Sequence, residues 1–253
     1  MQGLAFIVGC PRSGTSILLD LIGSHPDVIP VFEAHHLWES VVPQSDHHRI
    51  TEGHATPDVI KRLHSSLKPP PGRLLVEKNP RNSLRIPFLR AVWPHAKFVH
   101  IVRDGRDTVC SLKPGIGGED WLHAKPPSWK WMRDELSWPE RGAVYWSDML
   151  YYIENDLGPN SLTIKYEDLV SSPLAMMNRV QRFLGVNDSI VVQRACHMVS
   201  DKTSEGKHAA AQMQHYKDDH AVRVGRWREN LDADDAEHIE QMMWSHLSKY
   251  NYV

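Results

Sequence analysis

The chain has 253 residues, a formal net charge of −2, and 41% hydrophobic residues. This length is enough for one enzyme domain with a sizeable core, and the balanced charge excludes a general basic field for nucleic acid or anionic membranes. Any anion-binding site must therefore be local. No run approaches the ~20 apolar residues of a membrane span, no signal-peptide pattern is present, and three cysteines without close spacing suit a reducing compartment. We therefore expect a soluble, cytoplasmic protein.

The first predicted elements form a phosphate-binding loop. The apolar run from Leu4 to Val8 predicts a strand, and the pattern from Ile17 to Ile22 predicts a helix. A strand, a tight turn and a helix N-terminus direct backbone N–H groups at one anion. Loops that bind nucleoside triphosphates carry a lysine where this chain has Thr15, and its positive charge is at Arg12 instead. The loop therefore predicts a phosphate-binding site that is not an ATP site. The residues expected to bind the phosphate are Arg12, Ser13, Gly14, Thr15 and Ser16.

The remaining pattern alternates strands with helices. Further strands are predicted near 73–77, 97–102 and 161–166, and helices near 14–24, 82–93, 106–112, 140–155, 173–184 and 233–247. This alternation predicts an α/β fold with three layers, α/β/α, around a central parallel sheet. We expect one domain over residues 1–253, with a tryptophan-rich insertion around 113–146.

Three later blocks place charged residues beside the predicted sheet. Glu77-Lys78-Asn79-Pro80 stands at the end of the strand predicted near 73–77. Arg103 follows the strand 97–102, at the edge where open α/β sheets bind ligands. Ser111 lies about two helical turns further on and can point back to that edge. An arginine and a hydroxyl are suited to phosphate recognition. The third block, Gly225-Arg226-Trp227-Arg228, offers guanidinium groups and an aromatic ring, or alternatively forms a basic loop over a helix.

These blocks, in this order, resemble sulfotransferases that use 3′-phosphoadenosine 5′-phosphosulfate (PAPS), which have a P-loop-type fold. The resemblance implies that the loop around Arg12 holds the 5′-phosphosulfate and that Arg103 and Ser111 hold the 3′-phosphate. It also implies that Gly225, Arg226, Trp227 and Arg228 are a cofactor segment. By the same resemblance, Lys78 lies with Arg12 at the bridging oxygen of the cofactor, although a lone lysine is more often solvated. Tyr166, in Lys165-Tyr166-Glu167-Asp168-Leu169, matches a family block near the nucleotide, or is a core tyrosine.

The resemblance also suggests a catalytic base. His25-Pro26-Asp27-Val28 is similar to a segment of the tyrosylprotein sulfotransferases, in which a catalytic glutamate follows five residues later. In this chain that position is Glu33, with no gap from Arg12. The alternative base is His35 or His36. The two adjacent histidine pairs lack the spacing of a metal site, so we expect no metal.

An acceptor pocket is expected near the insertion. Five tryptophans lie between 121 and 146, and we expect at least three of them to form a small satellite core. The others, for which Trp121 and Trp129 are the candidates, are expected to line the acceptor pocket with Glu33, His35 and His36. Residues 203–222 are predicted to be mobile and to order over the cofactor.

The sequence therefore predicts a PAPS-dependent sulfotransferase, a transferase that moves a sulfuryl group to a hydroxyl, or alternatively an amine, of a small-molecule, carbohydrate or peptide acceptor. Two other functions stay open. A P-loop kinase for a small molecule would need a lysine at Thr15 and acids that hold Mg²⁺. A non-catalytic nucleotide-binding regulator would keep the loop and lack the base. The acceptor and the oligomeric state do not follow from the sequence.

Overall fold

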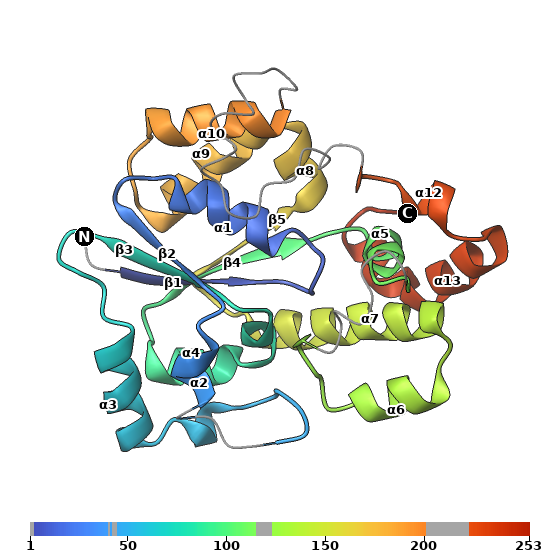
Figure 1. Ribbon diagram of the computed structural model, residues 1–253, viewed down its shortest axis with the longest axis horizontal. Coiled ribbons are helices and arrows are strands. Elements are labelled where there is room, and N and C mark those ends of the chain that lie inside the picture. Colours follow the sequence, from blue (N-terminus) through green and yellow to red (C-terminus); the bar gives the residue numbers. More distant parts are fainter. Residues whose placement is uncertain (1–2, 40, 42–44, 115–122, 201–222) are drawn as a thin grey trace.

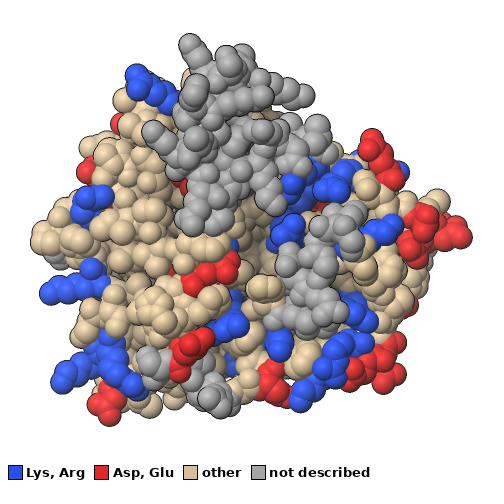
Figure 2. Space-filling view, viewed as in Figure 1, with Lys and Arg blue, Asp and Glu red and all other residues tan. Residues whose placement is uncertain are grey.

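The computed structural model describes residues 3–39, 41, 45–114, 123–200 and 223–253. Its centre is a five-stranded sheet in the order β2-β3-β1-β4-β5, in which all four pairs of neighbouring strands are parallel (Figure 1). The strands are β1 (Gly3–Val8), β2 (Val28–Phe32), β3 (Leu74–Lys78), β4 (Lys97–Val102) and β5 (Ser161–Lys165). The predicted α/β fold and parallel sheet are confirmed, and so are the four predicted strands. Basic and acidic side chains are interspersed over the face shown in Figure 2, in keeping with the balanced composition.

Strand β2 was not predicted, and its proline explains why. Pro30 interrupts the apolar run from Val28 to Phe32 and has no N–H to donate to a neighbouring strand. The strand lies at the edge of the sheet and pairs on one side with β3. An edge strand tolerates proline because one of its sides needs no partner. This strand carries the chain to Glu33.

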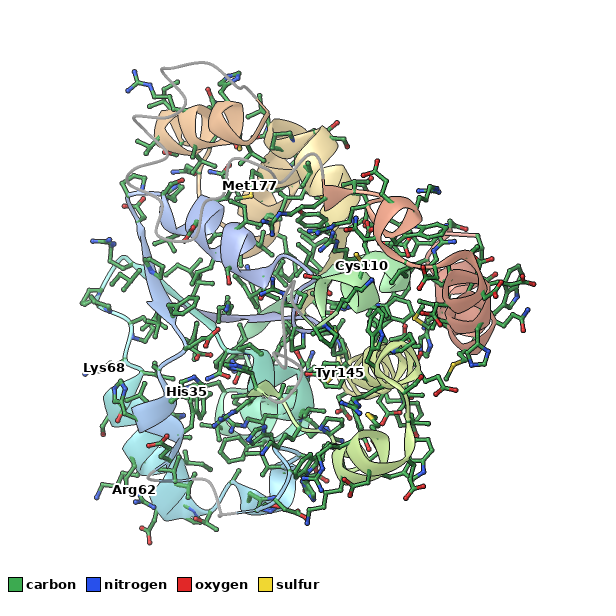
Figure 3. The ribbon with its side chains drawn as sticks, turned by 45° about the vertical axis from the view of Figure 1, so that its right-hand side comes forward. His35, Arg62, Lys68, Cys110, Tyr145 and Met177 are labelled. Atoms are coloured by element: carbon green, nitrogen blue, oxygen red, sulfur yellow. The ribbon has the colours of Figure 1, made fainter. Side chains whose placement is uncertain are left out.

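Helices cover both faces of the sheet, as Figure 1 shows. One face carries α1 (Thr15–Gly23), α8 (Tyr166–Ser171), α9 (Pro173–Leu184) and α10 (Ile190–Ser200). The other carries α2 (His35–Glu39), α3 (Pro57–Ser66) and α4 (Ile86–Val92). Met177 of α9, labelled in Figure 3, packs on the first face. The helix α7 (Trp138–Asp156) contributes Ile153 to the cluster on the second face. The three-layer arrangement is thus confirmed.

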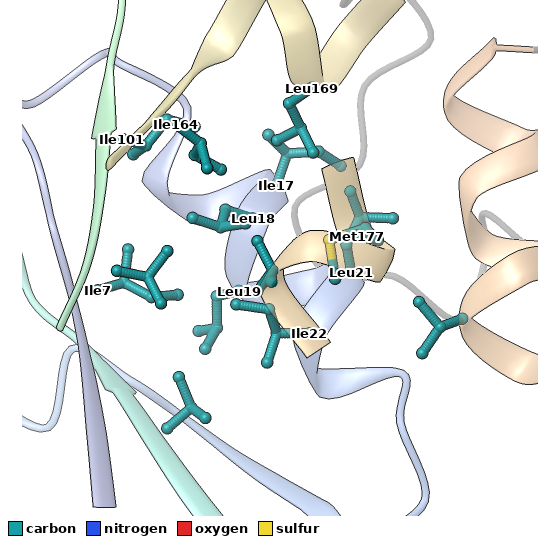
Figure 4. Packing of buried hydrophobic residues seen from close by; sticks show 14 of the residues in the cluster. Ile7, Ile17, Leu18, Leu19, Leu21, Ile22, Ile101, Ile164, Leu169 and Met177 are labelled. Carbon is teal, nitrogen blue, oxygen red and sulfur yellow. The ribbon is translucent and has the colours of Figure 1, made fainter. Parts of the chain in front are cut away.

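The alternating direction of side chains along each strand divides the apolar residues between the two faces of the sheet. In β1, Ala5 and Ile7 pack against α1, whereas Phe6 and Val8 belong to the cluster with α3 and α4. Successive strand side chains point to opposite faces, so a strand covered on both sides is apolar throughout. Figure 4 shows the first cluster, in which Ile7 and leucines of α1 meet Met177 and Leu169.

A third cluster lies beyond the carboxyl ends of the strands. It joins α5 (Gly105–Ser111), α6 (Trp129–Glu135), α7, α12 (Trp227–Asn230) and α13 (Ala233–Lys249). Trp129, Trp138 and Trp146 all pack in it. The predicted satellite core of at least three tryptophans is confirmed, whereas Trp131 is 52% exposed.

One predicted helix is divided. The chain between 80 and 92 forms the 3₁₀ helix η2 (Pro80–Leu84) and then α4, with Arg85 between them. Pro87 has no N–H and fits the first turn of a helix, so it starts a new helix and cannot continue the previous one. A short 3₁₀ helix, η1 (Glu52–His54), precedes α3. None of the described helices is long and apolar enough to cross a membrane.

Candidate active site

The loop between β1 and α1 has the geometry of an anion-binding turn. Ser13 donates its N–H to the Cys10 carbonyl at 3.1 Å, and the Ser83 hydroxyl bonds both the N–H and the carbonyl of Gly9 at 2.9 Å. Gly14 caps α1 with a φ of 93°, and Arg12 also has a positive φ, 72°. A left-handed non-glycine residue is uncommon and concentrates at functional turns.

The loop passes close to Tyr166 and has a buried polar group that suits a phosphate. A Cβ built on Gly14 would lie 2.4 Å from Cδ2 of Tyr166, so the turn passes close to that ring. Ser13 is fully buried, and its hydroxyl is without a hydrogen-bond partner among the described residues. Thr15 and Ser16 begin the helix whose N-terminus faces the loop. A buried donor that lacks a partner is expected where a ligand binds, so these residues fit a phosphate or sulfate group.

The structure brings the two predicted phosphate sites together. The Arg12 Nε donates to the Ser111 hydroxyl at 3.0 Å, and the Arg103 Nη1 donates to the Arg12 carbonyl at 3.1 Å. The Arg103 guanidinium also lies over the Tyr166 ring, 4.7 Å from its centre. Arg103 is 3% exposed, and its Nε has no partner in the described part of the chain. The strand end, the helix α5 and the first loop therefore meet at one point, as predicted.

The C-terminal block joins the same site through Asp107. Its carboxylate accepts from the N–H groups of Gly225 at 2.7 Å and Trp227 at 3.1 Å, and lies 3.7 Å from the Arg103 Nη2. Burial raises the pKa of Asp107 against the opposing effect of Arg103. Sequence reasoning missed Asp107. The sequence signal for it was an acid four residues after Arg103, in the first turn of the predicted helix that follows.

Two arginine side chains already contact the Trp227 ring. The guanidinium carbons of Arg106 and Arg228 lie 4.4 and 4.5 Å from its centre. Adenine stacking at Trp227 therefore stays a prediction, as do the roles of Gly225, Arg226 and Arg228. The block does pack at the cofactor end of the sheet, where it contacts Asp107.

The predicted base and the predicted lysine form an ion pair. The Lys78 Nζ lies 2.5 Å from the Glu33 Oε1, and the Glu33 N–H donates to the Lys78 carbonyl at 2.8 Å. Glu33 has a φ of 42°, at the point where the chain leaves β2. Burial favours the neutral acid, but Lys78 and His35 outweigh it and hold the pKa of Glu33 below its usual value. Burial also lowers the pKa of Lys78, against the effect of Glu33.

The residues predicted for the acceptor pocket lie in different surroundings. His35 Nε2 lies 3.5 Å from the Glu33 Oε2, so the alternative base adjoins the first choice. His36 is exposed. Trp129 is 8% exposed and packs in the cluster with α7, and its acceptor role stays a prediction. Trp121 and the predicted lid over 203–222 lie outside the described residues.

No group of three His, Cys, Asp or Glu side chains that could hold a metal occurs within the described ranges. The three cysteines, all of which are described and buried, form no disulfide bond.

Comparison with known proteins gives a consistent set of matches. A family model described as "Sulfotransferase family" matches residues 5–189. Protein-tyrosine sulfotransferase 1 of Danio rerio is 28% identical over 209 residues, which are 74% of this chain and 55% of that protein. Protein-tyrosine sulfotransferase 2 of Gallus gallus is 29% identical over 210 residues, 75% of this chain and 53% of that protein. The chain thus spans about half the length of these curated relatives.

Solved structures share the fold. The sulfotransferase domain from the curacin biosynthetic pathway has a TM-score of 0.59 at 18% identity, over 96% of this chain and 98% of that one. A mouse sulfotransferase, SULT7A1, complexed with PAP has a TM-score of 0.56 at 17% identity, over 97% of this chain and 85% of that one.

The close approach of Gly14 to Tyr166 gives a first prediction. Gly14→Ala should lower stability by about 1–3 kcal/mol, because the new Cβ meets the buried ring and strains a positive φ. Gly53→Ala is the matched control, since nothing lies within 4 Å of its Cβ position. Urea unfolding of both variants measures the difference, and equal midpoints would contradict the described turn.

Proposed function

Because the chain belongs to the sulfotransferase family, we propose that it transfers a sulfuryl group from PAPS to a hydroxyl group of an acceptor. The observation that carries the proposal is the position of a carboxylate and lysine pair, Glu33 and Lys78, at the same edge of the sheet as the anion-binding loop. A phosphate loop alone would suit several nucleotide-binding functions. A loop with a neighbouring base suits group transfer to a hydroxyl.

PAPS supplies the activated sulfuryl group when it is bound. The residues that would hold it are Ser13, Gly14, Thr15 and Ser16 at the 5′ end, and Arg103 with Ser111 at the 3′-phosphate. Arg12 connects the residues of the 5′ end with those of the 3′-phosphate through its hydrogen bond to Ser111. Tyr166 and the block 225–228 complete the proposed nucleotide site.

Glu33 is the proposed general base. It holds its negative charge at neutral pH, and a carboxylate within hydrogen-bond reach of the acceptor hydroxyl can take its proton during attack. His35 stays the alternative. Burial and the charge of Arg81 hold the pKa of His35 below its usual value, so its ring is neutral and able to accept a proton.

Arg12 and Lys78 are the proposed electrostatic catalysts. Both are cations at the edge where charge would develop on the leaving group, and a preorganised cation stabilises such charge strongly in a site shielded from water. Lys78 is 2% exposed, so its charge is little screened. Lys78 must part from Glu33 before either group acts on its own partner.

The acceptor and the location belong to the proposal as well. The relatives are named protein-tyrosine sulfotransferases, which makes a phenolic hydroxyl, such as that of a peptide tyrosine, the first acceptor class to test. A cytoplasmic location is supported by the three cysteines, which form no disulfide bond. The kinase alternative is not favoured, because Thr15 stands at the position of the kinase-type loop lysine.

The proposed 3′-phosphate site predicts nucleotide selectivity. The protein should bind 3′-phosphoadenosine 5′-phosphate (PAP) far more tightly than the analogue without the 3′-phosphate. Arg103→Ala should remove most of that difference, by up to about 3 kcal/mol, as loss of a charged hydrogen bond does. Isothermal titration measures both affinities, and equal affinities in the unmodified protein would refute the assignment.

The proposed base predicts a selective loss of turnover. Glu33→Gln should lower kcat by about 10²–10⁴-fold and leave PAP affinity nearly unchanged, because it preserves shape and removes the ability to take a proton. The measurement uses labelled PAPS with a phenol acceptor, and His35→Ala is the parallel variant. A Glu33→Gln enzyme with normal turnover beside an inactive, folded His35→Ala would move the base to His35.

The proposed cations predict metal independence. Activity should survive EDTA, because Arg12 and Lys78 provide the positive charge that Mg²⁺ provides in kinases. The assay compares turnover before and after chelation. A complete loss that Mg²⁺ reverses would favour phosphoryl transfer.

A further inference from the structure

The peptide bond between Arg103 and Asp104 is held from both sides. The Arg103 carbonyl accepts the indole N–H of Trp146 at 3.2 Å, and the Asp104 N–H donates to the Glu167 Oε1 at 3.0 Å. The carbonyl and the N–H belong to one planar unit and point in opposite directions, so the two bonds together fix how that plane is turned. Because the plane adjoins the Arg103 Cα atom, its orientation sets the direction in which the arginine side chain leaves the strand end.

The second oxygen of Glu167 is held by Tyr252. The Tyr252 hydroxyl donates to the Glu167 Oε2 at 2.8 Å. Burial raises the pKa of Glu167, against the hydrogen bonds from the Asp104 N–H and from Tyr252. The Lys165 Nζ lies over the Tyr252 ring, 4.5 Å from its centre, and keeps the ring beside the carboxylate. A carboxylate that accepts on both oxygens is restrained in its rotation, so Tyr252 holds Glu167 where it reaches Asp104.

The backbone of Tyr252 reaches Asp104 by a second route. Its carbonyl accepts from the Arg106 Nη2 at 2.9 Å, beside α5 and near the end of the chain marked in Figure 1. Arg106 donates to both oxygens of the Asp104 carboxylate, from Nε at 3.0 Å and from Nη2 at 2.8 Å. Asp104 is therefore held at its N–H through Glu167 and at its side chain through Arg106, and both routes lead to Tyr252.

The Arg103 guanidinium needs this support because most of it is already committed to the protein. Its Nη1 and Nη2 donate to the carbonyls of Arg12 and Arg223, and its face lies over the ring of Tyr166, the residue before Glu167. Within the described residues, its Nε is the guanidinium nitrogen without a partner. A small rotation at the strand end would turn this nitrogen away from a ligand.

We propose that Glu167 and Tyr252 are positioning residues for the 3′-phosphate site. The Tyr252 hydroxyl holds the Glu167 carboxylate, which fixes the peptide after Arg103 and so directs the Arg103 Nε at the 3′-phosphate. Neither residue contacts the nucleotide, since both act through Arg103. The inference deepens the proposed function and rests on its assignment of Arg103 to the 3′-phosphate.

The charge of Glu167 lets the direction of an effect decide between two roles. A carboxylate near an anion site repels a phosphate, so by charge alone its removal would strengthen nucleotide binding. Removal of a positioning group weakens binding instead. Tyr252→Phe changes no charge and keeps the ring under Lys165, so it removes the hydrogen bond to Glu167 alone.

The test compares PAP with adenosine 5′-phosphate (AMP), which lacks the 3′-phosphate, by isothermal titration. Tyr252→Phe should weaken PAP binding about three- to tenfold and Glu167→Ala about tenfold or more, with AMP affinity changed less than about twofold. Glu167→Gln should retain most of the PAP affinity, because its amide can accept from the Asp104 N–H and donate to the Tyr252 oxygen. Unfolding would lower the bound fraction for both nucleotides alike, so the ratio of the two affinities separates positioning from instability.

Two neighbouring residues provide matched controls. Tyr250→Phe removes a tyrosine hydroxyl that bonds Glu154 and not Glu167. Asp168→Asn removes an exposed carboxylate next to Glu167. Both variants should leave the ratio of PAP to AMP affinity unchanged.

Two results would overturn the positioning role. One is a Tyr252→Phe protein that keeps the full preference for PAP over AMP. The other is a Glu167→Ala protein that binds PAP more tightly, as charge alone requires. A different result would contradict the proposed function. If the unmodified protein binds PAP and AMP equally, Arg103 holds no 3′-phosphate, and the positioning role fails with that assignment.

Discussion

The buried guanidinium of Arg103 is the contact on which the cofactor end of the molecule depends. It donates to the carbonyl of Arg12 in the first loop and to the carbonyl of Arg223 before the C-terminal block. The Asp107 carboxylate lies 3.7 Å away, and Trp146 donates its indole N–H to the Arg103 carbonyl. One residue at the end of β4 therefore fixes segments about 90 residues before it and 120 residues after it. Its loss would loosen the site as well as remove a charge.

The buried charges around Arg103 and around Arg85 are compensated in different ways. Around Arg103, each cation has carbonyls, a carboxylate or an aromatic face as partner. Around Arg85, the donors outnumber the acids, and the nearest acid, Glu77, has a raised pKa. The first arrangement is balanced except at the Arg103 Nε, which lacks a partner among the described residues and is the donor left for a nucleotide phosphate.

The sequence predicted the parts of the structure that depend on local pattern. Four strands, the phosphate loop and the positions of Arg103 and Ser111 follow from apolar runs and from the rule that ligands bind at the carboxyl edge of a parallel sheet. Strand β2 was missed because Pro30 breaks its pattern, and only its place at the sheet edge makes that proline acceptable. Asp107 and Tyr252 were missed for another reason. Their roles depend on which groups surround them, and partners such as Gly225 and Glu167 are far away in the sequence.

The ion pair between Glu33 and Lys78 lies on the acceptor side of the proposed site. While the pair is closed, Lys78 contacts one oxygen of the base and lowers its basicity, and the charge of Lys78 is itself neutralised. A negative group near Lys78 would compete with Glu33 for the ammonium, and release of the lysine would raise the pKa of Glu33 toward its usual value. A stronger base would then form at the moment when the positive charge is needed at the leaving group. Under the proposed function, the ion pair has to open before Glu33 acts as the base and before Lys78 acts at the leaving group.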